Sequence, residues 1–404
     1  LENAMPMFLR KKLHALLMLI MGVVVRFSPP LRHTAFAGSG SSRQLCEHIV
    51  RTGAKKVLVV TDKPLRDLGV VDKAIAALLA ADIDIAFYDG VLPDPTYDQV
   101  AAGAAIAKRH GSEVVLAIGG GSSMDAAKVI AAAATSSAAP TDWVGMGKIK
   151  HVPLKLYAIP TTSGTGSEAT MGAVISDVKT HEKGIIMGEC LLPTAVALDA
   201  DLIVGLPPHI TAATGMDALT HGIEAYIGVW ERGTRLEDAR LAIKLIFENL
   251  PIACRDGGNR DARSAMTMAA YYAGLAINQV NVGNVHAIAH QLGGKYGIPH
   301  GLANALVLPH VLEFCHLEAQ ARLAELAILI GVGSVGEAPS TLAHQFIKAV
   351  QDLRTEVGIP DQMPVIKRED FESICALAIK EGGMYPVPRL LDRDSVLHIL
   401  HKIS

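Results

Sequence analysis

The stretch Glu113-Val-Val-Leu-Ala-Ile-Gly-Gly-Gly-Ser-Ser-Met-Asp-Ala-Ala-Lys128 decides the fold class of the first half of the chain. An apolar, β-rich run ends at Ile118, three glycines follow, and helical periodicity begins at Ser122. A strand that leads through a glycine turn into a helix is typical of an α/β sheet. The glycines let a ligand approach the backbone, and the helix N-terminus attracts anions. We expect Ser122 to cap this helix, with Asp125 three residues on, and the loop to bind phosphate.

The glycine loop has an alternative interpretation. Its spacing is not GxGxxG, so an ordinary tight turn before a capped helix remains open. Asp62 follows the predicted strand 57–60 and could hold a ribose, although it precedes the loop in sequence.

The same strand–helix alternation extends along the first half of the chain. Strands are predicted at 56–60, 83–87 and 113–118, and helices at 72–80, 97–110 and 122–134. This pattern indicates a mostly parallel, doubly wound sheet with helices on both faces. Beyond Pro207-Pro208 the β-rich runs stop and helical periodicity continues. We predict an N-terminal extension over 1–26, an α/β domain over 27–206 and an all-α C-terminal domain over 207–404.

A second polar loop, Pro160-Thr-Thr-Ser-Gly-Thr-Gly-Ser-Glu-Ala-Thr170, follows the predicted strand 154–159. Hydroxyl groups and backbone donors at the C-terminal end of a strand lie where open α/β sheets bind ligands. The alternative is a Ser/Thr-rich surface loop. Lys183 could contact a phosphate or simply be solvated.

Potential metal ligands occur as two pairs with helical spacing. Asp217 and His221 are four residues apart, as are His286 and His290, and His300 follows in a Gly-Ile-Pro-His-Gly turn. A spacing of four residues places two side chains on one helix face. These polar groups lie among apolar neighbours, where burial without a partner is costly. One carboxylate and several imidazoles suit Fe, Zn, Mn or Co better than Ca or Mg.

Bulk composition restricts the partners. Apolar residues make up 50% of the 404 residues and charged ones 19%, which indicates a globular protein with room for two domains. A net charge of −3 without a basic run argues against nucleic acid as the main partner. The five cysteines are scattered and form no CxxC motif, so we expect reduced thiols in a cytoplasmic protein.

The N-terminus carries Arg10-Lys-Lys12 before an apolar run over 15–25. This run is too short to span a bilayer but has the proportions of a secretory signal, and Ala35-Phe-Ala37 could pass for a cleavage site. Against export, the sequence after Phe36 looks like the turn that ends the first strand. We therefore expect an N-terminal helix or a disordered extension, and no membrane partner.

Four motifs together resemble the iron-containing (group III) alcohol dehydrogenase family. They are Gly119-Gly-Gly-Ser-Ser-Met-Asp125, Pro160-Thr-Thr-Ser-Gly-Thr-Gly-Ser-Glu168, Ala212-Ala-Thr-Gly-Met-Asp-Ala-Leu-Thr-His221 and Val285-His-Ala-Ile-Ala-His-Gln-Leu-Gly-Gly-Lys-Tyr-Gly-Ile-Pro-His-Gly301. The resemblance extends from about Phe27 to the C-terminus and implies the two-domain plan of dehydroquinate synthase-like proteins, with a dinucleotide-binding and a metal-binding domain.

The resemblance implies roles for particular residues. The metal, Fe2+ or Zn2+, would be held by Asp217, His221, His286 and His300, with His290 nearby as a candidate proton relay. Asp62 resembles the acidic residue of members that prefer NAD. The remaining residues expected to bind NAD are Gly119, Gly120, Gly121, Ser122, Ser123, Asp125, Thr161, Thr162, Ser163, Thr165, Thr170 and Lys183.

The resemblance also implies the reaction: NAD-linked oxidation of short primary alcohols or diols, and reduction of the aldehydes, in the cleft between the domains. The metal would act as a Lewis acid on the substrate oxygen, and NAD would accept the hydride. Ile277 replaces a phenylalanine common in the family, which implies a roomier substrate pocket. Val387 and Asp94 also depart from the usual residues. We expect a homodimer or larger homo-oligomer.

Two groups of alternatives remain. Hydroxyacid-oxoacid transhydrogenases, glycerol dehydrogenase-like enzymes and dehydroquinate synthase-like lyases have related folds, although the three histidines fit the iron group better. A catalytically idle metal-binding protein of the same fold is the alternative outside enzymes.

Overall fold

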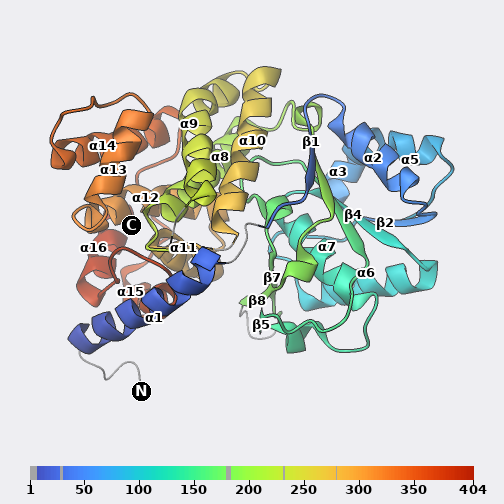
Figure 1. Cartoon of the computed structure of the whole chain (residues 1–404), viewed down its shortest axis with the longest axis horizontal. Coiled ribbons are helices and arrows are strands. Elements are labelled where there is room, and N and C mark those ends of the chain that lie inside the picture. The colour runs from blue at the N-terminus through green and yellow to red at the C-terminus, as the bar shows by residue number, and fades with distance from the viewer. Residues whose placement is uncertain (1–6, 28–30, 179–182, 231–232, 279) are drawn as a thin grey trace. The chain divides into compact units, whose positions relative to one another are not determined.

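The computed structural model describes residues 7–27, 31–178, 183–230, 233–278 and 280–404 (Figure 1). The chain divides into two compact units. Of the described residues, those within 31–206 and 256–274 form the α/β unit, and those within 7–27, 207–255 and 275–404 form the helical unit. Most of α10 (Arg260–Ile277) therefore groups with the sheet, although it follows the first helices of the other unit in sequence.

A six-stranded parallel sheet forms the centre of the α/β unit and confirms the predicted fold class. Its strand order is β1-β9-β6-β4-β2-β3, and every pairing is parallel. The strands are β1 (Thr34–Ala37), β2 (Lys56–Val60), β3 (Asp84–Tyr88), β4 (Val114–Gly119), β6 (Lys155–Pro160) and β9 (Ala195–Leu198). The direction of strand addition reverses between β2 and β4. Open α/β sheets bind ligands beyond the carboxyl ends of strands at such a switch point.

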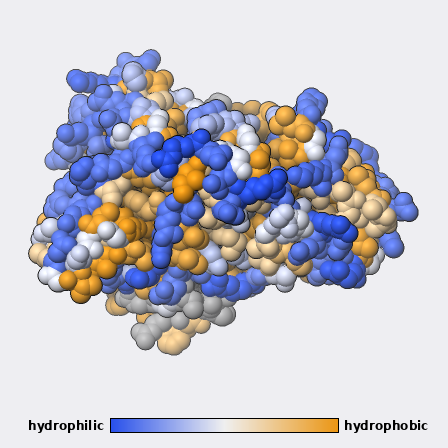
Figure 2. All heavy atoms as spheres, turned by 90° about the horizontal axis from the view of Figure 1, so that it is seen from above, coloured by the Kyte–Doolittle hydropathy of each residue, from blue (hydrophilic) through white to orange (hydrophobic). Residues whose placement is uncertain are grey.

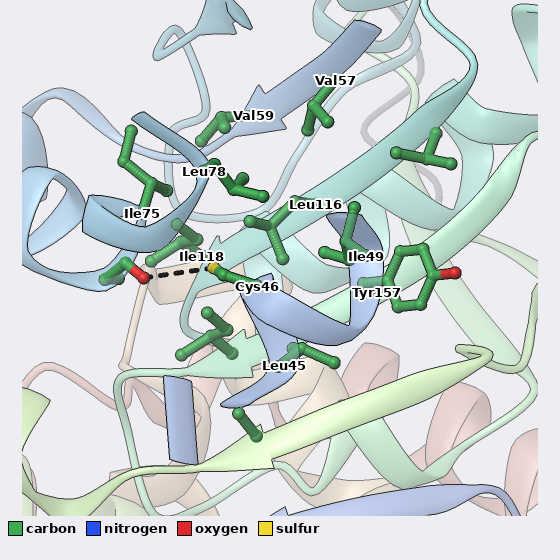
Figure 3. Packing of buried hydrophobic residues seen from close by; sticks show 14 of the residues in the cluster. Leu45, Cys46, Ile49, Val57, Val59, Ile75, Leu78, Leu116, Ile118 and Tyr157 are labelled. Atoms are coloured by element: carbon green, nitrogen blue, oxygen red, sulfur yellow. Dashed lines mark hydrogen bonds between the residues drawn. The ribbon is translucent and has the colours of Figure 1, made fainter. Parts of the chain in front are cut away.

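Helices cover both faces of this sheet, which explains its nearly continuous apolar strands. Every residue of β4 is buried. Successive residues of a strand point to opposite faces, and Val57, Val59, Leu116 and Ile118 join the core cluster that includes Leu45 and Leu78 from the helices (Figure 3). The helices of this unit, besides α10, are α2 (Ser41–Arg51), α3 (Lys63–Asp67), α4 (Val70–Ala74), α5 (Ala76–Ala80), α6 (Tyr97–His110) and α7 (Gly121–Ala133).

Two local predictions were wrong. The helix expected over 72–80 is two short helices, α4 and α5, which meet at Ile75. The expected Ser122 cap is absent: α7 begins at Gly121 after Gly120, without a side-chain cap. Asp125 does not fold back to that helix end, because its carboxylate accepts hydrogen bonds from Ser167 and Val174.

Smaller elements complete the α/β unit. A second sheet has the order β5-β8-β7, formed by β5 (Gly145–Met146), β8 (Lys183–Met187) and β7 (Gly172–Ser176). The 3-10 helices of this unit are η2 (Pro140–Trp143), η3 (Ser167–Ala169), η4 (Glu189–Leu191) and η5 (Ala200–Leu202). Cleavage after Ala37 would remove β1, which pairs with β9 along its whole length.

In its described residues, the helical unit consists of α-helices and one 3-10 helix. They are α1 (Met7–Phe27), α8 (Pro208–Ile227), α9 (Thr234–Arg255), α11 (Asn284–Tyr296), α12 (His300–Cys315), α13 (Gln320–Leu329), α14 (Pro339–Glu356), η6 (Arg368–Asp370), α15 (Phe371–Gly382) and α16 (Arg393–Ile403). Within the described ranges, no helix has both the length and the apolar composition needed to cross a membrane. On the face drawn in Figure 2, hydrophilic residues alternate with smaller groups of hydrophobic ones.

Candidate metal centre and cofactor loops

Three helices of the helical unit bring the predicted metal ligands together. Asp217 and His221 come from α8, His286 from α11, and His300 is the first residue of α12. One ligand atom from each residue lies within 4.8 Å of the other three. The Nε2 atoms of His221 and His286 are 3.0 Å apart. The Oδ1 atom of Asp217 lies 3.4 Å from Nε2 of His300 and 3.9 Å from Nε2 of both His221 and His286.

A glycine allows α12 to begin so close to α8. A Cβ atom on Gly301 would lie 2.2 Å from the carbonyl oxygen of Ala213 and 3.2 Å from Cβ of Asp217. Gly297 ends α11 in the left-handed conformation with φ of 65°, which lets the chain turn back toward α8. The Gly-Ile-Pro-His-Gly sequence thus delivers His300 to the other ligands.

The donor set fits a divalent metal. Ligand atoms held about 2.0–2.2 Å from one ion in a tetrahedral site lie roughly 3.3–3.6 Å apart, and the observed separations of 3.0–3.9 Å lie around this range. Burial and the neighbouring histidines hold the pKa of His286 well below its ordinary value. Metal coordination requires a neutral imidazole of this kind.

Glu224 supports His286 and was missed by the sequence analysis. Its carboxylate lies 2.6 Å from Nδ1 of His286 and accepts hydrogen bonds from the backbone N–H groups of Gly283 and Val285. A carboxylate that accepts from the second ring nitrogen orients a ligating histidine. Burial raises the pKa of Glu224 to about 8, and the backbone hydrogen bonds oppose this rise. Its position three residues after His221, among apolar residues, was the available signal.

Asn304 lies four residues after His300 and contacts the same group of ligands. Its Nδ2 atom donates to Oδ1 of Asp217 at 2.6 Å and lies 3.1 Å from Nε2 of His286 and 3.2 Å from Nε2 of His300. The side chain is fully buried. Asn304 therefore fixes the carboxylate of Asp217, a role that was not predicted from the sequence.

His290 belongs to a separate hydrogen-bonded chain beside the ligands. Its ring stacks on that of His300 at 5.3 Å, and its Nδ1 lies 2.5 Å from Oε1 of Glu381. The hydroxyl of Tyr385 donates to the same Oε1 at 2.6 Å. Burial first, and Glu381 second, raise the pKa of Tyr385 well above its ordinary value, so the phenol stays protonated. His290 is thus connected away from the ligand group through a carboxylate and a phenol.

The two predicted cofactor loops lie against each other in the α/β unit. The N–H of Thr161 donates to the carbonyl of Gly119 at 2.9 Å. A Cβ atom on Gly120 would lie 3.3 Å from Oγ1 of Thr162, and one on Gly121 would lie 2.7 Å from Cγ2 of Thr165. The glycines therefore allow close approach between loops at the carboxyl ends of the neighbouring strands β4 and β6.

Lys128 joins these loops and was not predicted to have a role. Its Nζ donates to Oγ of Ser167 at 2.8 Å, to Oγ1 of Thr170 at 3.0 Å and to the carbonyl of Gly172 at 2.6 Å. Burial lowers the pKa of Lys128 to about 8, although Asp125 and Glu168 oppose this. A lysine among alanines of a buried helix was the available signal.

Asp62 and Lys183 both have partners within the protein. The Oδ1 atom of Asp62 accepts a hydrogen bond from the N–H of Leu65 at 2.9 Å and caps α3, and burial raises its pKa. Lys183 Nζ lies 2.7 Å from Oδ1 of Asp94. Asp94 has a positive φ of 54°, a conformation that Asn and Asp tolerate better than most residues.

The other predicted residues have the following positions. Ser122 and Ser123 lie in the first turn of α7, and a Cβ on Gly119 would lie 2.4 Å from Oγ of Ser123. Ser163 Oγ lies 3.2 Å from Oγ1 of Thr267. Ile277 is the last residue of α10 and belongs to the helical unit.

Comparisons with known proteins agree with this architecture. The model of the iron-containing alcohol dehydrogenases matches residues 33–200, and the C-terminal model of the Fe-containing alcohol dehydrogenase family matches residues 211–404. The chain is 37% identical to 1,3-propanediol dehydrogenase of Klebsiella pneumoniae, with 91% of this chain and 96% of the relative covered. It is 35% identical to NAD-dependent methanol dehydrogenase of Bacillus methanolicus, with 93% of this chain and 98% of the relative covered.

A crystal structure of a 1,3-propanediol oxidoreductase superposes with a TM-score of 0.90 at 36% identity, covering 93% of this chain and 99% of the other. These matches confirm the family and the enzyme class predicted from the motifs. The chain belongs to the iron-containing alcohol dehydrogenase family.

Proposed function

We propose that this protein is a metal-dependent, NAD-linked alcohol dehydrogenase acting on short primary alcohols or diols and the matching aldehydes. The observation that carries the proposal is the convergence of Asp217, His221, His286 and His300 within 4.8 Å. Three of these four side chains are buried, and His300 is partly exposed. A buried donor set with one accessible member suits a metal that must also meet a substrate.

When bound, a divalent metal would supply Lewis acidity to the alcohol oxygen, and NAD would accept the hydride. The protein contributes fixed ligand positions. Glu224 holds the ring of His286 through Nδ1, and Asn304 holds the carboxylate of Asp217. These contacts keep ligand nitrogens and oxygen oriented before any substrate arrives.

His290 is the residue we propose to move the alcohol proton. Its Nδ1 contacts Glu381, which leaves Nε2 as the ring atom for proton exchange. An imidazole suits this task because its ordinary pKa lies close to neutrality. Glu381 and Tyr385 orient the ring from the other side.

The NAD assignment rests on the α/β unit. The glycine loop and the second polar loop (160–170) extend from β4 and β6, next to the switch point of the sheet. Asp62 follows β2 on the other side of β4, with Oδ2 3.7 Å from where a Cβ on Gly119 would lie. A carboxylate there accepts from a ribose hydroxyl and repels a 2′-phosphate, so we propose a preference for NAD over NADP. Exchange of Asp62 for glycine should narrow the difference between the two cofactors in kcat/KM.

The cellular setting is also part of the proposal. All five cysteines are free thiols, which supports the reducing cytoplasm. The predicted homo-oligomer stays a prediction.

Metal analysis tests the ligand set. The purified protein should contain close to one equivalent of divalent metal, and His300→Ala should lose most of it together with activity. His316→Ala is the matched control, because His316, Glu313 and His344 form a second, more exposed group that could hold an ion. Full metal content in His300→Ala, or loss in His316→Ala alone, would refute the assignment.

A further inference from the structure

Helix α1 has apolar side chains on two opposite faces, and the described residues of the protein cover only one of these faces. Met18 and Val25 are buried in a small cluster with Trp230 and Val280. The indole Nε1 of Trp230 donates to the carbonyl of Met18 at 2.8 Å, and a Cβ on Gly22 would lie 3.3 Å from the indole ring. These contacts attach one side of α1 to the helical unit.

The other face of α1 is apolar and exposed. Its side chains keep large exposed fractions: Leu13 54%, Leu16 54%, Leu17 45%, Ile20 54%, Val23 51% and Phe27 80%. At about 100° per residue, these six positions fall within an arc of roughly 120°, whereas Leu19, 67% exposed, and Met21, 37% exposed, lie outside it. The covered positions 14, 18, 22 and 25 centre roughly 160° away. Single exposed leucines are ordinary on protein surfaces, but a continuous helical stripe indicates an interaction surface.

Charge identifies the kind of partner. Helix α1 contains four basic residues, at 10, 11, 12 and 26, and no acidic residue. A pair of antiparallel copies of α1 would bring basic residues together at both ends, without an acidic complement. An anionic lipid surface offers both an apolar layer for the stripe and negative headgroups for the basic residues.

We propose that α1 docks the protein on anionic membrane surfaces, with the stripe Leu13, Leu16, Leu17, Ile20, Val23 and Phe27 inserted at the interface and Arg10 and Lys12 among the headgroups. The helix would lie in the plane of the interface and would not cross the bilayer. The sequence-based expectation of no membrane partner rested on the shortness of the apolar run. That length argues against spanning and leaves surface binding open.

A hollow of about 500 Å3 separates part of α1 from the segment Val387–Leu390. The protein therefore leaves part of the side of α1 that is attached to the helical unit uncovered as well. Neither the stripe nor this hollow includes the candidate metal ligands or the cofactor loops, so membrane binding and catalysis can be measured separately.

Vesicle flotation of the full-length protein tests the proposal. Vesicles of phosphatidylcholine with about one third phosphatidylglycerol should carry the protein, whereas pure phosphatidylcholine should carry much less. Added salt should weaken the binding, because it screens headgroup attraction. Leu16→Glu/Ile20→Glu should reduce the bound fraction at least tenfold, since it puts two charges into the apolar interface.

The matched control is Leu68→Glu/Val335→Glu, which adds the same charge at apolar residues that are 75% and 86% exposed elsewhere. The control should float like the wild type, and both variants should retain alcohol dehydrogenase activity as evidence of folding. Absence of wild-type flotation, equal binding to neutral vesicles, or undiminished binding of Leu16→Glu/Ile20→Glu would each overturn the proposal. If light scattering shows that this variant only lowers the molecular mass, the stripe covers a second copy and the proposal is wrong.

Discussion

Exchange of Lys128 for methionine should destabilise the α/β unit, and the structure gives the magnitude. Methionine keeps much of the length and apolar volume but removes a donor that makes three hydrogen bonds. Hydrogen bonds from a charged group contribute about 1.5–3 kcal/mol each, so about 4.5–9 kcal/mol is lost. Burial of the Lys128 ammonium offsets part of this stabilisation. Its pKa is lowered from 10.5 to about 8, which means that the folded protein disfavours the protonated form by about 3 kcal/mol.

The difference predicts a net destabilisation of about 1.5–6 kcal/mol for Lys128→Met. The chain has two tryptophans, and Trp143 lies in the α/β unit whereas Trp230 lies in the helical unit. In a Trp230→Phe background, Trp143 fluorescence during urea unfolding therefore reports on the unit that contains Lys128. The variant should also raise KM for NAD more than it lowers kcat, because both cofactor loops depend on this contact.

Lys108→Met provides the control, because Lys108 is an exposed lysine on the neighbouring helix α6. It should change the free energy of unfolding by no more than about 0.5 kcal/mol. A cost below about 1 kcal/mol for Lys128→Met, or one no larger than that of Lys108→Met, would refute the reasoning. Between pH 8 and 10.5 the Lys128 amine is largely protonated in the unfolded state and largely neutral in the folded state. The ionisation of Lys128 therefore increases the free energy of unfolding as pH rises through this window.

Three further predictions concern the helical unit. Gly301→Ala should lower the free energy of unfolding, measured by thermal unfolding, by about 1–3 kcal/mol or more and should reduce metal content, because its Cβ would meet the Ala213 carbonyl at 2.2 Å. The control Gly294→Ala has open space around it and should leave stability unchanged or raise it. Glu224→Gln should lower metal affinity about 10–100-fold in chelator competition, since it disturbs the orientation of a ligating imidazole; unchanged affinity would contradict the role of Glu224. If Ile277 lines a roomy pocket, wild-type kcat/KM should rise with alcohol chain length, at about 0.8 kcal/mol per buried methylene. Ile277→Phe should shift the optimum of kcat/KM toward shorter alcohols, and an unchanged dependence on chain length would contradict that role.

The sequence alone determined the parallel sheet and the identity of the candidate ligands. Strand periodicity followed by glycine is a local property, so the β4–α7 unit could be predicted from one stretch. The spacing of four residues between Asp217 and His221 likewise fixes their common helix face. The four motifs, each short and contiguous, were sufficient to indicate the family.

Only the tertiary structure decided which side chains support those residues. Glu224 meets His286, Lys128 meets Ser167, and His290 meets Glu381, with sequence separations of 62, 39 and 91 residues. Such contacts depend on how helices and loops pack, which a single sequence does not encode in any local pattern. The Ser122 cap was wrong because α7 begins at Gly121, and Asp125 instead accepts hydrogen bonds from Ser167 and Val174, which are distant in sequence. The difference between the two faces of α1 also needed the tertiary structure. The sequence places apolar residues on all sides of this helix, and packing against Trp230 covers one side.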